Sequence, residues 1–190
     1  IRRAESRKKS KEGDPLVAEI SAKTVKALRD QTGAGMMDCK RALADANGDV
    51  EKAVELLRER GLAKAGKRSG RATSEGTIGM ALLGETAALV ELDCETDFDA
   101  KTDEFQSAAV QIAKAVAASG AGNDVEEALG CKLGDGNVGD EIGAIATKVG
   151  ENVVLKRVAK IAVDGGLTGG YVHAGGKLGV IVGLKADPSI

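Results

Sequence analysis

Residues 102–117 read TDEFQSAAVQIAKAVA, and this stretch decides the architecture that the sequence predicts. Its apolar residues recur at the spacing of one helical face. They are Phe105, Ala108, Ala109, Ile112, Ala113 and Val116. Thr102 is a suitable N-cap, and Asp103 and Glu104 follow in the first turn, where carboxylates favour the positive end of the helix dipole. A helix with one apolar stripe needs a partner layer, and we expect that layer to be a sheet.

The strands of this sheet are expected on both sides of the helix in the sequence. The predicted strands are 76–83, 86–91, 153–163, 170–174 and 177–185. Tight turns at Gly84-Glu85 and Gly175-Gly176 join two pairs of them into hairpins. Strands and helices do not alternate in a strict βαβ order. The sequence therefore predicts an α+β domain with an antiparallel sheet that is covered on one face.

The region between the central helix and the third strand is rich in glycine. We expect a loop over 119–139, with one helical turn at 124–129. Residues 140–149 are predicted to form a helix that Gly150 stops, since glycine readily adopts the left-handed conformation that ends helices.

The first part of the chain has the periodicity of short helices. Ser21 can cap a helix that ends at a Gly-Ala-Gly break. A second helix is expected over 36–46, with Met37, Leu43 and Ala46 in the core, and a third begins after the cap Asp49. Together they predict a small three-helix bundle over residues 16–62.

Two basic segments flank this bundle. Residues 63–75, AKAGKRSGRATSE, are expected to be a linker or a fraying helix. Residues 1–12 carry six basic and two acidic side chains, which gives +4, and we expect a basic disordered tail over 1–15. This tail is either a nucleic-acid or ribosome-binding arm or a solvated linker. The α+β core domain then takes residues 76–190, and we expect it to be incomplete at its C-terminal end.

The composition excludes several classes of protein. Among 190 residues, 27 Lys and Arg face 29 Asp and Glu, and this balance argues against a protein that coats nucleic acid. The longest apolar runs are far below the roughly 20 residues that span a bilayer, so we expect a soluble protein without a membrane partner. Three cysteines without a C-x-x-C pair favour a reducing compartment over disulfides or zinc. No phosphate-loop or dinucleotide motif occurs in the sequence, and we expect no cofactor and no metal.

Cys94 and His173 are the minimal pair that could suggest nucleophilic catalysis. His173 is the only histidine and lies beside a predicted hairpin turn. Cys94 is followed by Glu95, whose charge disfavours a thiolate. We therefore expect a protein that is not an enzyme.

Residues 93–99, DCETDFD, place one of only two phenylalanines among four carboxylates at a strand-to-helix corner. An aromatic ring in such surroundings suits a contact offered to another protein. Alternatively, Thr96 and Asp99 form a capping box and Phe98 folds back beneath the helix. These residues alone favour neither alternative.

Met36 and Met37 open the second small helix. Consecutive helical positions point about 100° apart, so one methionine can be buried while the other is exposed. A flexible apolar side chain at a helix start suits a partner contact. A core filler beside a tolerated surface residue explains the pair equally well.

Several stretches, in the same order along the chain, resemble the translation elongation factor Ts family. The main ones are VKALR at 25–29, TGAGMMDCKRAL at 32–43 and CETDF at 94–98. GEN at 150–152, YVH at 171–173 and GVIV at 179–182 are similar to later family landmarks. The resemblance covers about residues 18–186.

This resemblance implies a UBA-like three-helix bundle followed by an α+β core. It also implies a guanine-nucleotide exchange factor that promotes GDP release from elongation factor Tu during translation. Asp97 and Phe98 would intrude near the switch region of that partner and loosen the bound GDP. Arg29, Met36 and Met37 would hold the small bundle on it.

The resemblance further implies that Val149, Gly150 and His173 contact the partner from the core domain. The sequence departs from the family at Asp99, where members usually carry an apolar residue. This departure puts the strength of nucleotide exchange in doubt, but not the family. Many members continue beyond the position of Ile190, so a homodimer, a fragment and a weakened exchanger all stay open. A ribosome-associated interaction protein with weak or no exchange is the alternative function. The implied location is the bacterial cytoplasm or the plastid stroma.

Overall fold

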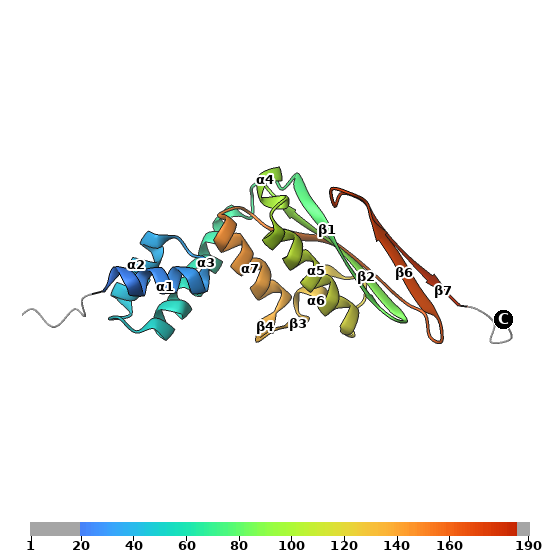
Figure 1. Ribbon diagram of the computed structural model, residues 1–190, viewed down its shortest axis with the longest axis horizontal. Helices are drawn as coiled ribbons and strands as arrows, with labels where there is room; N and C mark the ends of the chain where they lie inside the picture. The colour runs from blue at the N-terminus through green and yellow to red at the C-terminus, as the bar shows by residue number, and fades with distance from the viewer. Residues whose placement is uncertain (1–19, 186–190) are drawn as a thin grey trace, which may run out of the picture. The chain divides into compact units, whose positions relative to one another are not determined.

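The computed structural model describes residues 20–185, which divide into two compact units on either side of the Leu57–Arg58 bond. Figure 1 follows the chain through both units. The predicted basic tail over 1–15 lies outside the described residues. Among the described helices, none combines the length and apolarity needed to cross a membrane.

The first unit consists of helices. Helix α1 spans Ala22–Thr32, α2 spans Met36–Asp45, and α3 begins at Val50. Ser21 caps α1 as expected, because its hydroxyl accepts the Thr24 N–H at 3.0 Å. Their common core is formed by Val25, Leu28, Ala34, Cys39, Ala42, Leu43, Ala46, Ala53 and Leu57. Three helices are therefore present where the sequence predicts them, while the likeness to a UBA bundle stays a prediction.

The expectation that Met37 lies in this core is wrong. Its side chain is 62% exposed, and that of Met36 is 44% exposed. The buried stripe of α2 contains Cys39, Ala42 and Leu43 instead. Met37 precedes Cys39 by two positions, about 200° around the helix, so it points away from the stripe.

Helix α3 continues to Arg68, so the first part of 63–75, which was expected to be a linker or a fraying helix, is helical. Alanine, lysine and arginine are strong helix formers, which explains why the basic composition extends the helix. Lys67 and Arg68 occupy the last turn, where cations favour the negative end of the dipole. Arg68 also donates to the carbonyl of Ala146 at 2.9 Å, so tertiary contact holds this end.

The second unit is built on a three-stranded antiparallel sheet. Strands β1 (Glu75–Leu83), β2 (Thr86–Cys94) and β5 (Val154–Ala162) lie in the order β1-β2-β5. Gly84 adopts φ 66° in the β1–β2 turn. In the register, Glu75 pairs with Cys94 and Asp93 pairs with Val154. The antiparallel sheet of the predicted α+β fold is thus confirmed.

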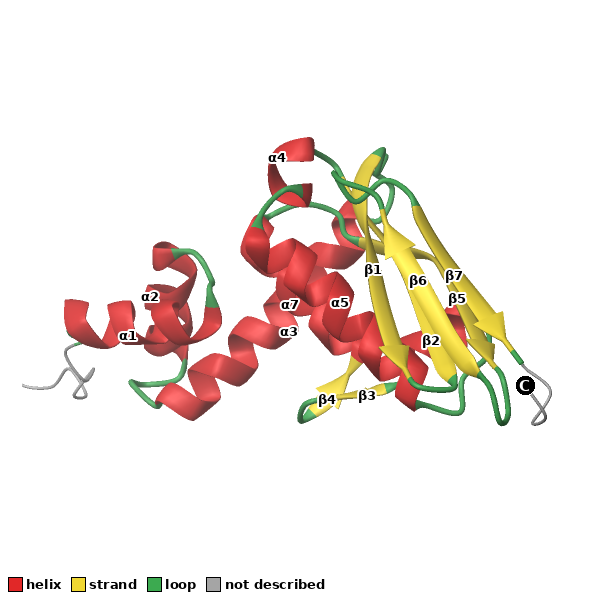
Figure 2. Ribbon diagram, turned by 45° about the vertical axis from the view of Figure 1, so that its right-hand side comes forward, coloured by secondary structure: helices red, strands yellow, loops and turns green. Residues whose placement is uncertain are grey.

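Helix α5, Asp103–Ala118, covers one face of this sheet (Figure 2). Thr102 is its N-cap, and the predicted apolar stripe is buried as a whole. Phe105 is completely buried, at 0% exposure. The helix packs closely because Gly79 on β1 has no side chain. A Cβ at Gly79 would overlap the carbonyl group of Ala109.

Shorter elements complete this layer. They are α4 (Asp97–Ala100), α6 (Val125–Leu129), β3 (Lys132–Leu133), β4 (Gly136–Asn137) and α7 (Val138–Val149). The β3–β4 pair lies within the segment 119–139, where a loop was expected. The sequence does not predict this pair, because two-residue strands are too short to show an alternating pattern. Helix α7 starts in a capping box between Asn137 and Asp140, and Gly150 ends it at φ 81°.

The expectation that the sheet is covered on one face only is incomplete. A second hairpin, β6 (Leu167–Val172) and β7 (Gly179–Leu184), packs on the face opposite α5. Gly170, Gly179 and Gly183 face that sheet, where a Cβ would overlap Met80, Ile78 and Val163. Small residues on the inner side therefore allow the hairpin to lie close over the sheet.

Gly79→Ala is expected to destabilise the chain by about 1–3 kcal/mol or more, because the added methyl group overlaps the backbone of α5 rather than a movable side chain. The free energy of unfolding in urea measures this. Gly169→Ala is the matched control, since Gly169 is also a strand glycine but a Cβ there meets nothing within 4 Å. Equal stability of the two variants would contradict the close α5–β1 packing.

Candidate functional site

Phe98 is the outstanding feature of the second unit, because its side chain is 83% exposed. It lies in α4, the short helix at the corner between β2 and α5. Of the two alternatives left by the sequence, the exposed ring is therefore correct. Thr96 occupies the N-cap position of α4, but its side chain makes no cap hydrogen bond to this helix. The capping box of Thr96 and Asp99 is not formed.

The side chain that holds this corner comes from another segment. Glu151 Oε2 accepts the N–H groups of Glu95 at 3.0 Å and Thr96 at 3.1 Å. Its Oε1 accepts the Thr96 hydroxyl at 2.6 Å. Glu151 directly follows Gly150, the C-cap of α7. The end of α7 is thus tied to the start of α4.

A second set of hydrogen bonds runs in the opposite direction. The Asn152 N–H donates to Glu95 Oε1 at 2.7 Å, and Asn152 Nδ2 donates to the Arg71 carbonyl at 2.9 Å. Arg71 Nη1 lies 3.3 Å from Glu95 Oε1. The pKa of the Glu95 carboxyl is lowered, chiefly by the Asn152 N–H and further by Arg71. We call the mutual contacts of Glu95, Thr96, Glu151 and Asn152 the corner clasp.

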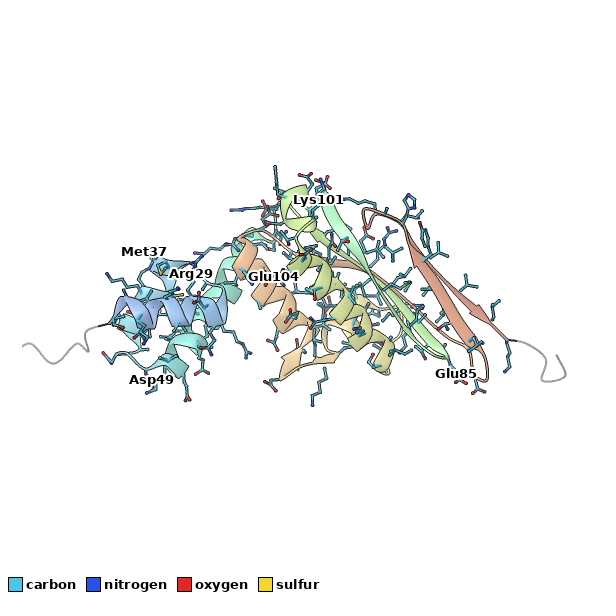
Figure 3. All side chains as sticks on the ribbon, in the orientation of Figure 1. Arg29, Met37, Asp49, Glu85, Lys101 and Glu104 are labelled. Atoms are coloured by element: carbon cyan, nitrogen blue, oxygen red, sulfur yellow. The ribbon has the colours of Figure 1, made fainter. Side chains whose placement is uncertain are left out.

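Asp97 pairs with a cation on its own helical turn. Lys101 Nζ lies 2.6 Å from Asp97 Oδ2, and this hydrogen bond is the main reason that the pKa of Asp97 is lowered. The same contact raises the pKa of Lys101. Figure 3 labels Lys101 at this corner and Glu85 at the far end of the sheet.

The turn between β6 and β7 meets β1 at the end where α4 lies (Figures 1 and 2). The Ile78 N–H donates to the Gly176 carbonyl at 2.7 Å, and Lys177 Nζ lies 2.6 Å from Glu75 Oε2. His173 is exposed in this turn, and its Nδ1 lies 2.9 Å from the hydroxyl of Tyr171. The turn that carries His173 therefore belongs to the same end of the unit as the corner.

The predicted contact residues fall into two groups. Asp97 and Phe98 lie on α4, and the corner clasp joins this helix to the segment after Val149 and Gly150. Arg29, Met36 and Met37 are exposed on the first unit, where Figure 3 labels Arg29 and Met37. The roles of both groups in partner binding stay predictions.

The structure offers little for catalysis by Cys94. The thiol is buried and donates to the Thr96 carbonyl at 3.2 Å. Burial, and next the Glu151 carboxylate, raise its pKa to about 11, so the thiolate nucleophile is scarce near neutral pH. Within residues 20–185, no group of three or more His, Cys, Asp or Glu side chains could hold a metal ion.

Glu151 and Asn152 were not expected to shape the site. Their place beside Glu95 and Thr96 follows from the pairing of the strands. Because β2 and β5 are antiparallel neighbours, the residues after β2 must lie beside the residues before β5. This reasoning requires knowing which strands pair, and local periodicity does not provide that knowledge.

The second unit is an α+β domain that displays a single aromatic ring on a clasped corner. A family description, Elongation factor TS, matches residues 95–189. The elongation factor Ts of Clostridium acetobutylicum is 47% identical over 173 residues, which cover 88% of this chain and 56% of that protein. That of Chlorobium phaeobacteroides is 45% identical over 179 residues, which cover 91% of this chain and 62% of that protein. That of Paramagnetospirillum magneticum is 40% identical over 179 residues, which cover 92% of this chain and 57% of that protein.

The chain belongs to the elongation factor Ts family. It spans less than two thirds of the length of these relatives. The relatives are bacterial proteins, and none of the three is from a plastid.

Asp99→Asn is expected to stabilise the chain at about pH 7, by at most about 1 kcal/mol. Burial, and next the Glu151 carboxylate, raise the pKa of Asp99 above its ordinary 3.8. The folded state therefore holds this proton more tightly than the unfolded state. The ionised group lowers stability above its folded pKa, and this cost disappears as the pH falls below 3.8.

Urea unfolding at about pH 7 and about pH 3 measures the effect, and the gain should vanish at the lower pH. Asp103→Asn is the control, because Asp103 lies in the first turn of α5 and its charge favours the helix dipole. An Asp99→Asn gain that is equal at both pH values would contradict the ionisation argument.

Proposed function

We propose that this chain promotes GDP release from elongation factor Tu during translation elongation. The observation that carries the proposal is the exposure of Phe98 on a corner whose backbone is tied to the core. An aromatic side chain in water gains free energy by entering a pocket on a partner. Membership of the elongation factor Ts family supports that partner.

The proposed mechanism needs no covalent chemistry. Phe98 enters the nucleotide-binding domain of the partner in a conformation that holds GDP weakly. By linkage, contact free energy available only in that conformation weakens GDP binding by the same factor. Each 1.4 kcal/mol of differential contact corresponds to about a tenfold change in affinity. A buried aromatic anchor contributes about 2 kcal/mol or more, which is sufficient for large acceleration.

Other residues supply affinity in this proposal, and two of them, Asp97 and Val149, are half-buried. Asp97 stands beside Phe98 and brings a charge that Lys101 already balances in the free protein. Val149, Gly150 and His173 extend the contact on the second unit. On the first unit, Arg29, Met36 and Met37 bind the same partner separately.

Phe98→Ala is expected to reduce the acceleration of GDP release at least about tenfold, because the anchor is lost while the exposed position leaves the fold intact. Release of a fluorescent GDP analogue from elongation factor Tu measures this. Leu83→Ala is the control, since Leu83 is also an exposed apolar residue but lies at the far end of β1. The proposal fails if the unaltered chain does not accelerate release.

We further propose that the chain forms a homodimer through the outer face of the β6–β7 hairpin. The apolar side chains exposed there are Leu167, Tyr171, Leu178, Val180, Val182 and Leu184. Along the two strands every position on this face is uncharged, because it carries an aliphatic side chain, a glycine or Tyr171, so a second copy brings no charge against it. Apolar patches of this kind mark interaction surfaces.

The double variant Val180→Lys and Val182→Lys is expected to be a monomer, because the dimer would bury both charges without a partner. Analytical ultracentrifugation across a range of concentrations measures the mass. Leu83→Lys, an exposed apolar position outside the hairpin, is the control and should keep the dimer. A monomeric unaltered chain overturns the homodimer.

A further inference from the structure

We propose that Glu151 is a positioning residue for the corner that displays Phe98. Its carboxylate fixes the backbone at Glu95 and Thr96, so the aromatic ring is held ready for its partner before binding. The consequence for exchange rests on the proposed function, whereas the consequence for the corner itself does not.

The first reason is that Glu151 accepts three hydrogen bonds from the two residues that directly precede α4. The two oxygens of Glu151 accept two consecutive backbone N–H groups and one hydroxyl group. Hydrogen bonds to an ionised carboxylate are stronger than those between neutral groups. Thr96, the N-cap residue, directs its hydroxyl to Glu151 and not to its own helix. The conformation of the corner is therefore set from outside α4.

The second reason is that Glu151 replaces a local residue in a familiar role. In a capping box, the third residue of a helix accepts the N–H of the N-cap residue. In α4 that third residue is Asp99, yet the acceptor for the Thr96 N–H is Glu151, 55 positions along the chain. The α4 helix has only four residues, which is too short to order itself.

The third reason is that Glu151 is itself held firmly. It lies between the C-cap Gly150 and the buried Asn152, whose backbone N–H donates to Glu95. The clasp therefore has two arms that connect the same two segments in opposite directions. Asn152 also reaches the Arg71 carbonyl, so a third segment restrains the arrangement.

Preorganisation explains why this matters for binding. A corner that moves freely must be ordered when the partner binds, and the ordering reduces affinity. With the clasp formed, that ordering is part of the fold. Loss of Glu151 should therefore weaken the interaction without removing Phe98, and the half-saturating concentration should change more than the maximal rate of release.

The direct test uses the full chain alone. Amide hydrogen exchange of Glu95 and Thr96, followed by NMR, should accelerate at least about tenfold in Glu151→Ala. Glu151→Gln should keep most of the protection, because its Oε1 can accept the N–H groups while its Nε2 donates to the Thr96 hydroxyl. Glu126→Ala, an exposed glutamate of α6, is the control. Protection that is unchanged both in Glu151→Ala and in the double variant Glu151→Ala, Asp99→Val overturns the proposal.

Asp99 can mask the effect, since it could form the local capping box once Glu151 is absent. The double variant Glu151→Ala and Asp99→Val removes both acceptors, and protection at Thr96 should be lost there. If protection of the sheet amides falls as well, Thr96→Val decides the matter, because it removes only the hydroxyl donor. It should accelerate exchange at Glu95, and no acceleration overturns the proposal.

The test with the partner separates this inference from the proposed function. With elongation factor Tu and a fluorescent GDP analogue, Glu151→Ala should raise the half-saturating concentration about tenfold, and Glu151→Gln should restore it. No acceleration by the unaltered chain rejects the exchange function while the amide result still stands. If Glu151→Ala loses its amide protection and still has an unchanged half-saturating concentration for GDP release, the positioning role is overturned.

Discussion

The packing of α5 on β1 and β2 is the contact on which the rest of the second unit depends. Its stripe, from Phe105 to Val116, is buried against strands that carry alanine and glycine at the points of closest approach. Helix α5 follows β2 after a short connection. Because α5 packs on the face of the sheet, the chain must turn sharply between β2 and α5. The corner that carries Phe98 is the consequence of that turn.

The corner shows how an exposed apolar residue is kept in a fixed position. Phe98 contributes nothing to the core, in contrast to Phe105 seven residues later. A four-residue helix has too little stability of its own to order the ring. Order is imported through the corner clasp, in which hydrogen bonds connect the chain before α4 to the chain after α7. The acidic residues around the ring thus serve different purposes, since Asp97 pairs with Lys101 while Glu95 joins the clasp.

The hairpin β6–β7 adds a layer that the composition made feasible. Glycines on its inner side allow close approach to the sheet, and apolar residues on its outer side remain uncovered among residues 20–185. The chain is thus poor in aromatic residues yet closely packed, because backbone proximity replaces side-chain bulk. The turn of this hairpin brings His173 to the end of the unit where α4 lies.

The sequence by itself determined the longer helices and strands, though not the β3–β4 pair, since apolar spacing is local and burial follows it directly, as from Phe105 to Val116. It also singled out Phe98, but its two alternatives for that ring were equally consistent with neighbouring residues. Only the tertiary structure decided between them. It also decided that Met37 is exposed and that a second layer covers the sheet. The physical reason is that Thr96 finds its acceptor in Glu151, and Gly79 its neighbour in Ala109, through strand pairing and helix packing between distant segments. Periodicity specifies which face of an element is apolar, whereas it does not specify which distant element meets that face.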